Sequence, residues 1–470
     1  MDPKPLAAPS LGSWPADIWY LVFKLLSPAE FRALCRVNKM FCALAEPFLY
    51  SKIQWIWLTV RLPATFLRFL ETLISKPYLA TYITDIHLGG DTFRYQEFRR
   101  PVPIIPIPDE DLEEPIAFIR RTGVPFADMW IQELHNRTID AFVALLLAQT
   151  PNLKSLYLGH NFTQNSLLTG MVLRSSICEP ADHRLPNFEH LRDVYFLLAD
   201  SSDMVPGEKV QAAANPLPFF YVPNLKHMSA SIENPDTFTW PAAHPPVASN
   251  LKSLDLNWVR ETYLGELLSA TPTLETLRWH WYFDSGVEDQ FITKTLDLDR
   301  LTAAMSHVRG TLTDLTISAE VSIGGSDQFY PAMRIMGSLQ EMVEFDALKK
   351  LQIPWPLLVG FTKDLKRLQD VMPKNIESLT ITDDLRLQNE DRIKRDLPVW
   401  DWTHSAIVDV LRLWMKDWKT CTPHLRRVSL VISVLEYEPD DWASKLTHQL
   451  GVLSDQSGVQ LELINMTGEM

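Results

Sequence analysis

The stretch Leu251-Lys252-Ser253-Leu254-Asp255-Leu256 decides the fold, because its spacing of three apolar residues returns along the chain. In each copy two variable residues separate the first and second apolar positions, and one variable residue separates the second and third. The other copies have their apolar residues at Leu153/Leu156/Leu158, Leu312/Leu315/Ile317, Leu348/Leu351/Ile353 and, less clearly, Ile83/Ile86/Leu88, Leu191/Val194/Phe196, Leu225/Met228/Ala230, Leu274/Leu277/Trp279, Ile376/Leu379/Ile381 and Leu425/Val428/Leu430. About ten such units are typical of a solenoid, in which each repeat packs on the next.

Helical patterns lie between the copies, and they set the expected fold class. The best of them runs from Ile139 to Ala148, with Thr138 as a candidate N-cap. Proline precedes several copies, as in Thr150-Pro151 and Thr271-Pro272, and holds the approach to the strand extended. Strand, helix and strand in succession predict an α/β fold. We expect a curved array with a parallel sheet on the concave face and helices on the convex face.

Residues that flank the second apolar position should point away from the core, because side chains alternate along a strand. In a solenoid this concave surface is the one that binds ligands. Tyrosine and arginine dominate binding hot spots in general, so they rank first among the outward residues. The candidate substrate-binding residues are Tyr157, Tyr195, Asp255, Asn257, Arg278, His280 and Arg427. By the same alternation Trp279 and Trp281 are expected in the core, with Tyr282 pointing outward.

A second feature lies near the start of the chain, between Trp14 and Tyr50. Three short helical patterns follow one another there, and Pro15, Ser27-Pro28 and Pro47 mark the expected helix starts. About 40 residues with so many large apolar side chains can bury only part of them alone. The segment therefore requires cover, from the rest of the chain or from a partner.

This segment resembles an F-box. The matching residues are Trp14-Pro15-x-Asp17-Ile18, Val22-Phe23, Leu26, Glu30-Phe31, Leu34, Val37-Asn38-Lys39-x-Phe41, Leu44, Pro47 and Leu49-Tyr50. The chain departs from the usual motif at Trp14, Asp17 and Asn38, where leucine, glutamate and cysteine or serine are commoner. The resemblance implies a helical trio that docks on the Skp-type adaptor of a cullin-type ubiquitin ligase. The residues expected to build that docking trio are Pro15, Ile18, Val22, Leu26, Phe31, Leu34, Val37 and Phe41.

The remaining chain is similar, more loosely, to the leucine-rich-repeat-like region that follows the F-box in many proteins of filamentous fungi. Segments such as Phe345-x-x-Leu348-Lys349-Lys350-Leu351 carry this likeness. Together the two resemblances imply the substrate-recognition subunit of a ubiquitin ligase, which binds a protein substrate while its partners do the chemistry. Two alternatives stay open: a binding or scaffold protein that acts without ubiquitin transfer, and an enzyme with an unrecognised site in the array.

Composition narrows the function classes. The 470 residues carry a formal net charge of −14, which argues against nucleic-acid binding and weakly favours basic partners. Four scattered cysteines without C-x-x-C spacing predict reduced thiols in the cytoplasm or nucleus and no zinc site. No apolar run approaches the length of a membrane span. Nucleotide-binding, nucleophile-elbow and zinc-protease motifs are missing from the sequence, so neither a catalytic residue nor a cofactor is expected.

The expected domain organisation follows from these features. Residues 1–12 are predicted to be disordered, 13–53 to form the F-box and 54–466 to form the array. Loop insertions are expected near 91–128, 200–222 and 284–297, where the repeat rhythm breaks.

Overall fold

The computed structural model of the chain divides into two compact units. The first unit comprises Met1–Phe162 and Ser166–Leu191, and the second comprises Thr163–Asn165 and Arg192–Met470. The described residues are 16–57, 64–90, 105–163, 166–180, 182–197, 215–284, 293–322, 333–361, 367–385, 404–433 and 442–466. Residues 1–12, predicted to be disordered, lie outside them.

The first unit begins with the three predicted helices, α1 (Ala16–Phe23), α2 (Pro28–Val37) and α3 (Lys39–Ser51). Ser27 starts α2 with a capping box: its hydroxyl accepts from the Glu30 amide at 3.4 Å, and the Glu30 carboxylate accepts from its amide at 2.6 Å. Asn38 caps α3 by accepting from the Phe41 amide at 2.8 Å. Ser27-Pro28 and Asn38 therefore separate the helices, whereas Pro47, expected to mark a helix start, lies inside α3.

The first unit contains three parallel strands, which pair in the order β1 (Lys52–Ile56), β2 (Asp85–Gly89) and β3 (Ser155–Leu158). The insertion expected near 91–128 is in part helical, since α5 and α6 begin within it. The other elements of this unit are α4 (Ala64–Ser75), η2 (Pro77–Tyr82), η3 (Asp109–Leu112), α5 (Glu113–Thr122), α6 (Ala127–His135), α7 (Ile139–Leu147), α8 (His160–Thr163, its last residue in the second unit) and α9 (Leu167–Cys178).

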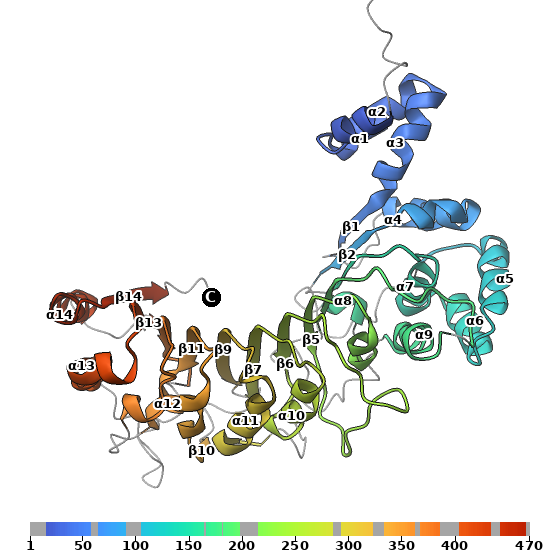
Figure 1. Cartoon of the computed structure of the whole chain (residues 1–470). Helices are drawn as coiled ribbons and strands as arrows, with labels where there is room; N and C mark the ends of the chain where they lie inside the picture. Colours follow the sequence, from blue (N-terminus) through green and yellow to red (C-terminus); the bar gives the residue numbers. More distant parts are fainter. Residues whose placement is uncertain are drawn as a thin grey trace, which may run out of the picture. The chain divides into compact units, whose positions relative to one another are not determined.

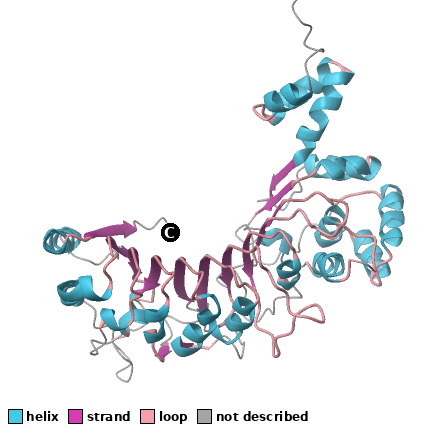
Figure 2. Cartoon of the chain, viewed as in Figure 1, coloured by secondary structure: helices cyan, strands magenta, loops and turns pink. Residues whose placement is uncertain are grey.

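The second unit is a run of parallel strands, each paired with the next, and it confirms the prediction of an α/β fold with a large parallel sheet. In Figure 1, α10, α11 and α12 lie on the same side of these strands, and Figure 2 shows the strands side by side. In spatial order they are β4 (Asp193–Phe196), β5 (His227–Ser231), β6 (Ser253–Asn257), β7 (Thr276–Asp284), β9 (Asp314–Ser322), β11 (Lys350–Pro354), β12 (Ser378–Thr382), β13 (Arg427–Ser433) and β14 (Gln460–Met466).

Helices and short turns connect these strands. A separate small sheet pairs β8 (Thr295–Asp297) with β10 (Arg334–Met336). The predicted insertions near 200–222 and 284–297 fall largely outside the described residues, but their ends hold η5 and β8. The connecting elements are η5 (Leu217–Tyr221), α10 (Glu261–Ser269), α11 (Leu298–Met305), η6 (Ser306–Val308), η7 (Gln340–Glu344), α12 (Trp355–Val359), η8 (Leu368–Asp370), α13 (His404–Cys421) and α14 (Trp442–Ser457).

The apolar positions of the repeat form the core, as predicted. Every one of them is buried in each of the copies, from Ile83 in the first unit to Leu430 in the second. Trp279 and Trp281 are also buried. Tyr282 was expected to point outward, and this is wrong: it is buried and stacks on Trp258, with ring centroids 6.4 Å apart. The connection after β6 covers that side of β7, which alternation along a single strand does not reveal.

Polar side chains fasten one repeat to the next at the turns before the strands. Asn152 donates to the Thr81 carbonyl, Asn250 to the Pro223 carbonyl and Asn375 to the Asp346 carbonyl, each at 2.7 Å. In each case the donor precedes the first apolar residue of its repeat, and the acceptor lies two residues before that position in the preceding repeat. The turns are thus stacked by side-chain hydrogen bonds in addition to the strand ladder.

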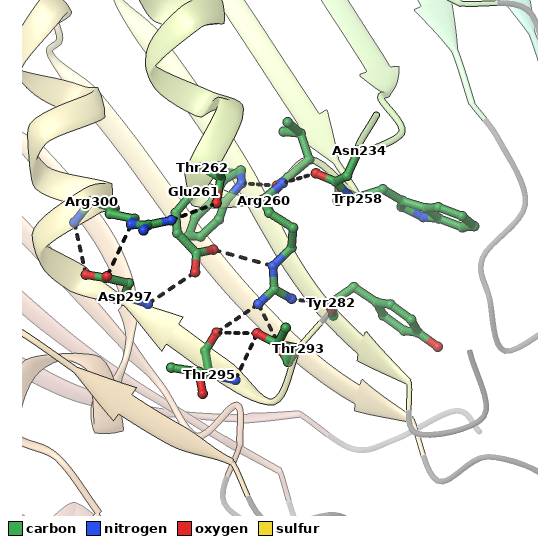
Figure 3. A network of polar contacts seen from close by, with 12 residues as sticks. Asn234, Trp258, Arg260, Glu261, Thr262, Tyr282, Thr293, Thr295, Asp297 and Arg300 are labelled. Carbon is green, nitrogen blue, oxygen red and sulfur yellow. Dashed lines mark hydrogen bonds and ion pairs between the residues drawn. The ribbon is translucent and has the colours of Figure 1, made fainter. Parts of the chain in front are cut away.

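A buried arginine fastens β7 to the connection that follows it (Figure 3). The Arg260 guanidinium donates to the carbonyls of Tyr282 at 2.9 Å, Thr293 at 3.0 Å and Thr295 at 2.9 Å. Its carbon Cζ lies 4.5 Å from the ring centroid of Trp281, and its Nε lies 3.4 Å from the Glu261 carboxylate. Arg260 and Glu261 are both buried, so this contact is an ion pair inside the protein.

A buried carboxylate joins α7 to α9 in the first unit. The two oxygens of Asp140 accept from the backbone amides of Leu168 at 2.6 Å and Thr169 at 2.9 Å, at the start of α9. Desolvation by burial raises the pKa of this carboxyl to about 6, although the hydrogen bonds from Thr169 and Leu168 oppose the rise. Because folding raises this pKa, the folded protein stabilises the neutral carboxyl relative to the unfolded chain.

This geometry predicts a pH-dependent effect of Asp140→Asn. The stabilisation from the neutral carboxyl is fully present below the ordinary pKa of 3.8 and is lost as pH rises towards about 6. Asparagine stays neutral, so between pH 4 and pH 7 the difference in unfolding free energy should move by about 2 to 3 kcal/mol in favour of the variant. Urea unfolding of both proteins at the two pH values measures this shift. A difference that stays constant with pH would contradict it.

Candidate functional site

The three N-terminal helices present apolar side chains to the surface although they have a packed core. That core consists of Trp19, Phe23, Phe31 and Ala45, with Trp19 packed edge-on against Phe41 at a centroid distance of 5.2 Å. On the opposite side of α1, Leu21 is 59% exposed, and Leu25 just beyond the helix is 85% exposed. Four further large apolar side chains of these helices are exposed, namely Ile18, Tyr20, Val37 and Met40. These six exposed residues come from all three helices and the turn after α1, and we refer to them together as the apolar patch.

The residues predicted to dock a partner divide between this patch and the core. Ile18 and Val37 are exposed, whereas Phe31 is buried and therefore stabilises the trio rather than offering a contact. Pro15 lies outside the described residues. The half-buried members pack against the core from its edge, and they are Val22, Leu26, Leu34 and Phe41.

The prediction missed most of the patch, which includes Leu21 and Leu25. Helical spacing contains the missing signal: positions 18 and 21 share one side of α1, position 25 continues that spacing in the turn beyond it, and positions 19 and 23 share the other side. Both sides are apolar, so periodicity alone does not tell which one faces the core. The aromatic pair Trp19 and Phe23 occupies the core in the structure.

The second candidate surface is formed by the outward side chains of the strands β4 to β14, and we call it the polar face. Its central part lies on β6 and β7, where Asp255 is in register with Arg278 and Asn257 with His280. Burial raises the pKa of the Asp255 carboxyl, while Arg278 and a hydrogen bond from Ser229 favour its charged form. The predicted residues Asp255, Asn257, Arg278 and His280 are therefore neighbours.

His280 connects β7 to the neighbouring strand β9. Its Nδ1 lies 2.8 Å from the Ser318 hydroxyl, and its Nε2 lies 3.6 Å from the Glu320 carboxylate. Asp384, in the turn after β12, accepts from the backbone amide of Ala319 at 3.0 Å. Burial raises the pKa of the Asp384 carboxyl as well. Carboxylates thus gather at the ends of these strands.

The other predicted residues lie apart from this centre. Tyr195 is exposed on β4, two strands from Asp255, and Arg427 is on β13, four strands from Arg278. Tyr157 belongs to β3 in the first unit and stacks on His87 with ring centroids 4.1 Å apart. The seven residues are therefore not one compact site.

Metal binding, membrane insertion and similarity to known proteins also bear on the class of function. Among the described residues, no group of three or more histidine, cysteine, aspartate or glutamate side chains could hold a metal ion. No helix within those residues is long and apolar enough to cross a bilayer. No protein-family model and no curated protein matches the chain. The function must therefore be inferred from the chain's own sequence and geometry.

Proposed function

We propose that this protein is the substrate-recognition subunit of a Skp–cullin–F-box ubiquitin ligase. Helices α1 to α3 would be an F-box that docks on a Skp-type adaptor, and the strand and helix repeats would be a curved leucine-rich-repeat-like array that binds a protein substrate. The observation that supports this proposal best is the apolar patch, which coexists with a complete core on the same short helices.

The physical argument concerns water. Fully burying one leucine, isoleucine or valine side chain is worth about 1.5 to 3 kcal/mol, so several of them exposed on one short module are an unused source of binding energy. Leu21 and Leu25 do not belong to the core of the three helices, so packing within those helices does not account for their apolar side chains. A partner that covers the patch would account for both.

The polar face supports the second half of the proposal. In repeat arrays each unit adds one strand to a continuous surface, and ligands bind there because rigid strands position the outward side chains. Asp255, Arg278 and His280 are held in this way by strand pairing. The substrate would contact this surface, and ubiquitin transfer would be carried out by the other subunits.

The docking half of the proposal is tested by Leu21→Glu/Leu25→Glu. Since both side chains are exposed, the double variant should fold normally while co-purification of a Skp-type adaptor falls at least about 100-fold, because two charges would be desolvated in the contact. Circular dichroism checks the fold. The matched control is Leu167→Glu, an exposed leucine on α9, which should leave adaptor binding unchanged.

The outcomes separate the alternatives. Adaptor binding that survives the double substitution would overturn the F-box assignment. If docking is lost as expected, proteomic comparison of cells with the native and double-variant proteins should reveal a protein that accumulates in the variant. Docking without any accumulating protein would favour a scaffold that acts without ubiquitin transfer.

A further inference from the structure

Acidic and basic side chains alternate across most strands of the polar face. In register or nearly so, Asp193 on β4 meets His227 on β5, and Asp255 on β6 meets Arg278 on β7. The alternation continues with Asp314 on β9 and Lys350 on β11. Serine replaces the acid on β12, and Arg427 on β13 is followed by Glu462 on β14. Opposite charges on adjacent strands stabilise the sheet modestly.

The two signs are not equally accessible. The Lys350 side chain is 69% exposed but its partner Asp314 only 34%, with 3.8 Å between Nζ and Oδ2. The Arg427 side chain is 53% exposed and Glu462 33%, with 4.0 Å between Nε and Oε1. Arg427 also donates to the Gln460 amide oxygen at 3.3 Å. Arg278 is exposed, whereas Asp255 is half-buried. The basic side chains are therefore more exposed to solvent than the acidic side chains on the neighbouring strands.

The cations are also regularly spaced. Arg278, Lys350 and Arg427 lie on β7, β11 and β13, with one intervening strand in each interval. Because neighbouring strands are about 4.8 Å apart, two strand spacings are about 10 Å. Arg278 is offset from the other two by two residues along the strands, a distance that its long side chain can span. The result is a row of positive charge across the sheet, in a chain whose net charge is −14.

We propose that this row binds an acidic, extended peptide segment of the partner protein, with carboxylate side chains at every third residue; this deepens the proposed substrate-binding role and rests on it. Residues three apart in a polyproline II segment share one face and lie about 9.3 Å apart, which matches the spacing of the row. The long ion pairs within the face leave Lys350 and Arg427 able to turn towards a peptide carboxylate.

The far ends of the strands set a limit to this surface. Towards the carboxyl-terminal end of β9 the acidic side chain is the more exposed one: Glu320 is 55% exposed and its partner His280 only 24%. An acidic segment would be repelled by Glu320 and would lie towards the amino-terminal ends of β11 and β13. The charge pattern therefore favours one path across the sheet.

The test uses the full-length protein and fluorescent peptides in an anisotropy titration at low salt. The probe is a repeated Glu-Pro-Pro peptide, and its comparisons are a peptide of the same composition with its glutamates clustered and a repeated Lys-Pro-Pro peptide. The first should bind at least about tenfold more tightly than either comparison, and its affinity should fall as salt is added. Equal binding of all three peptides, or no binding of the first, would overturn the proposal.

Charge reversal locates the site. Lys350→Glu/Arg427→Glu should weaken Glu-Pro-Pro binding at least about tenfold and allow Lys-Pro-Pro to bind. The matched control, Lys416→Glu, reverses an exposed charge on α13 and should change the affinity less than about twofold. Unchanged binding in the double variant would contradict the inference.

Adaptor docking is measured on the same proteins, so that the two proposals fail separately. Lys350→Glu/Arg427→Glu should retain the Skp-type adaptor, and Leu21→Glu/Leu25→Glu should retain the acidic peptide. If the native protein docks on the adaptor but does not bind the acidic peptide, only the acidic-segment inference is refuted. Adaptor docking absent with specific peptide binding present would refute only the ligase assignment.

Discussion

Arg260→Met is expected to lower the free energy of unfolding by about 3 to 5 kcal/mol. The substitution leaves the Glu261 carboxylate buried without its cation, since the two side chains are paired at 3.4 Å and both are almost inaccessible to water. It also removes the donor of three carbonyl groups, those of Tyr282, Thr293 and Thr295 (Figure 3). Urea unfolding followed by circular dichroism measures the loss.

Two variants make the test specific for the buried pair. Arg300→Met removes an arginine whose side chain is 61% exposed and lies 3.4 Å from Asp297, and it should cost less than about 1 kcal/mol. Adding Glu261→Gln to Arg260→Met should restore part of the stability, because the remaining group is then neutral and can still accept from the Asp297 amide. Equal losses for Arg260→Met and Arg300→Met would show that burial does not strengthen this pair.

The core of the repeats was predictable because it depends on spacing alone. Leu254 and Leu256 share one side of a strand, Leu251 enters from the turn, and all are buried. Each copy repeats this requirement, so even the weak copy Leu225/Met228/Ala230 identified a strand correctly. Local patterns thus predict the α/β class and the direction of the strand side chains.

Several elements were not predicted, and β1 and α5 illustrate two different reasons. β1 follows α3 directly, without the turn residues that announce the other strands, and its alternating sequence lacks the full repeat spacing. Glu113 and Glu114 fall within the loop insertion expected near 91–128. These residues occupy the first turn of α5, and Arg120 and Arg121 its last turn, which is the arrangement that the helix dipole favours.

The exposure of the candidate binding residues was harder to predict than the core, because tertiary contacts decide which outward side chains stay accessible. Alternation placed both His280 and Tyr282 outward, yet only His280 retains partial exposure, since Trp258 covers Tyr282. The same holds for charge. The sequence shows acids and bases intermixed on the polar face, whereas the structure shows Lys350 and Arg427 standing further out than their acidic partners.

The backbone at Gly90 lies very close to that of Trp57 in the first unit. Gly90 follows β2 with a φ of +142°, and its carbonyl accepts from the Asn161 amide at 3.0 Å. The Asn161 side chain in turn donates to the Trp57 carbonyl at 2.8 Å. A Cβ at position 90 would lie 2.2 Å from that carbonyl oxygen and 2.8 Å from the Asn161 Nδ2. Only glycine fits, because the nearest obstacle is backbone.

Gly90→Ala should therefore lower the unfolding free energy by about 3 to 5 kcal/mol, the combined effect of backbone strain and overpacking. Gly123→Ala is the matched control: that glycine also has a positive φ, +73°, but a Cβ there meets nothing within 4 Å, so only the conformational cost of about 1 to 2 kcal/mol remains. Urea unfolding of the two variants compares steric exclusion with φ strain. Similar losses in both would mean that β1 and β2 can separate enough to admit a methyl group, and that the Trp57, Gly90 and Asn161 contacts do not fix their spacing.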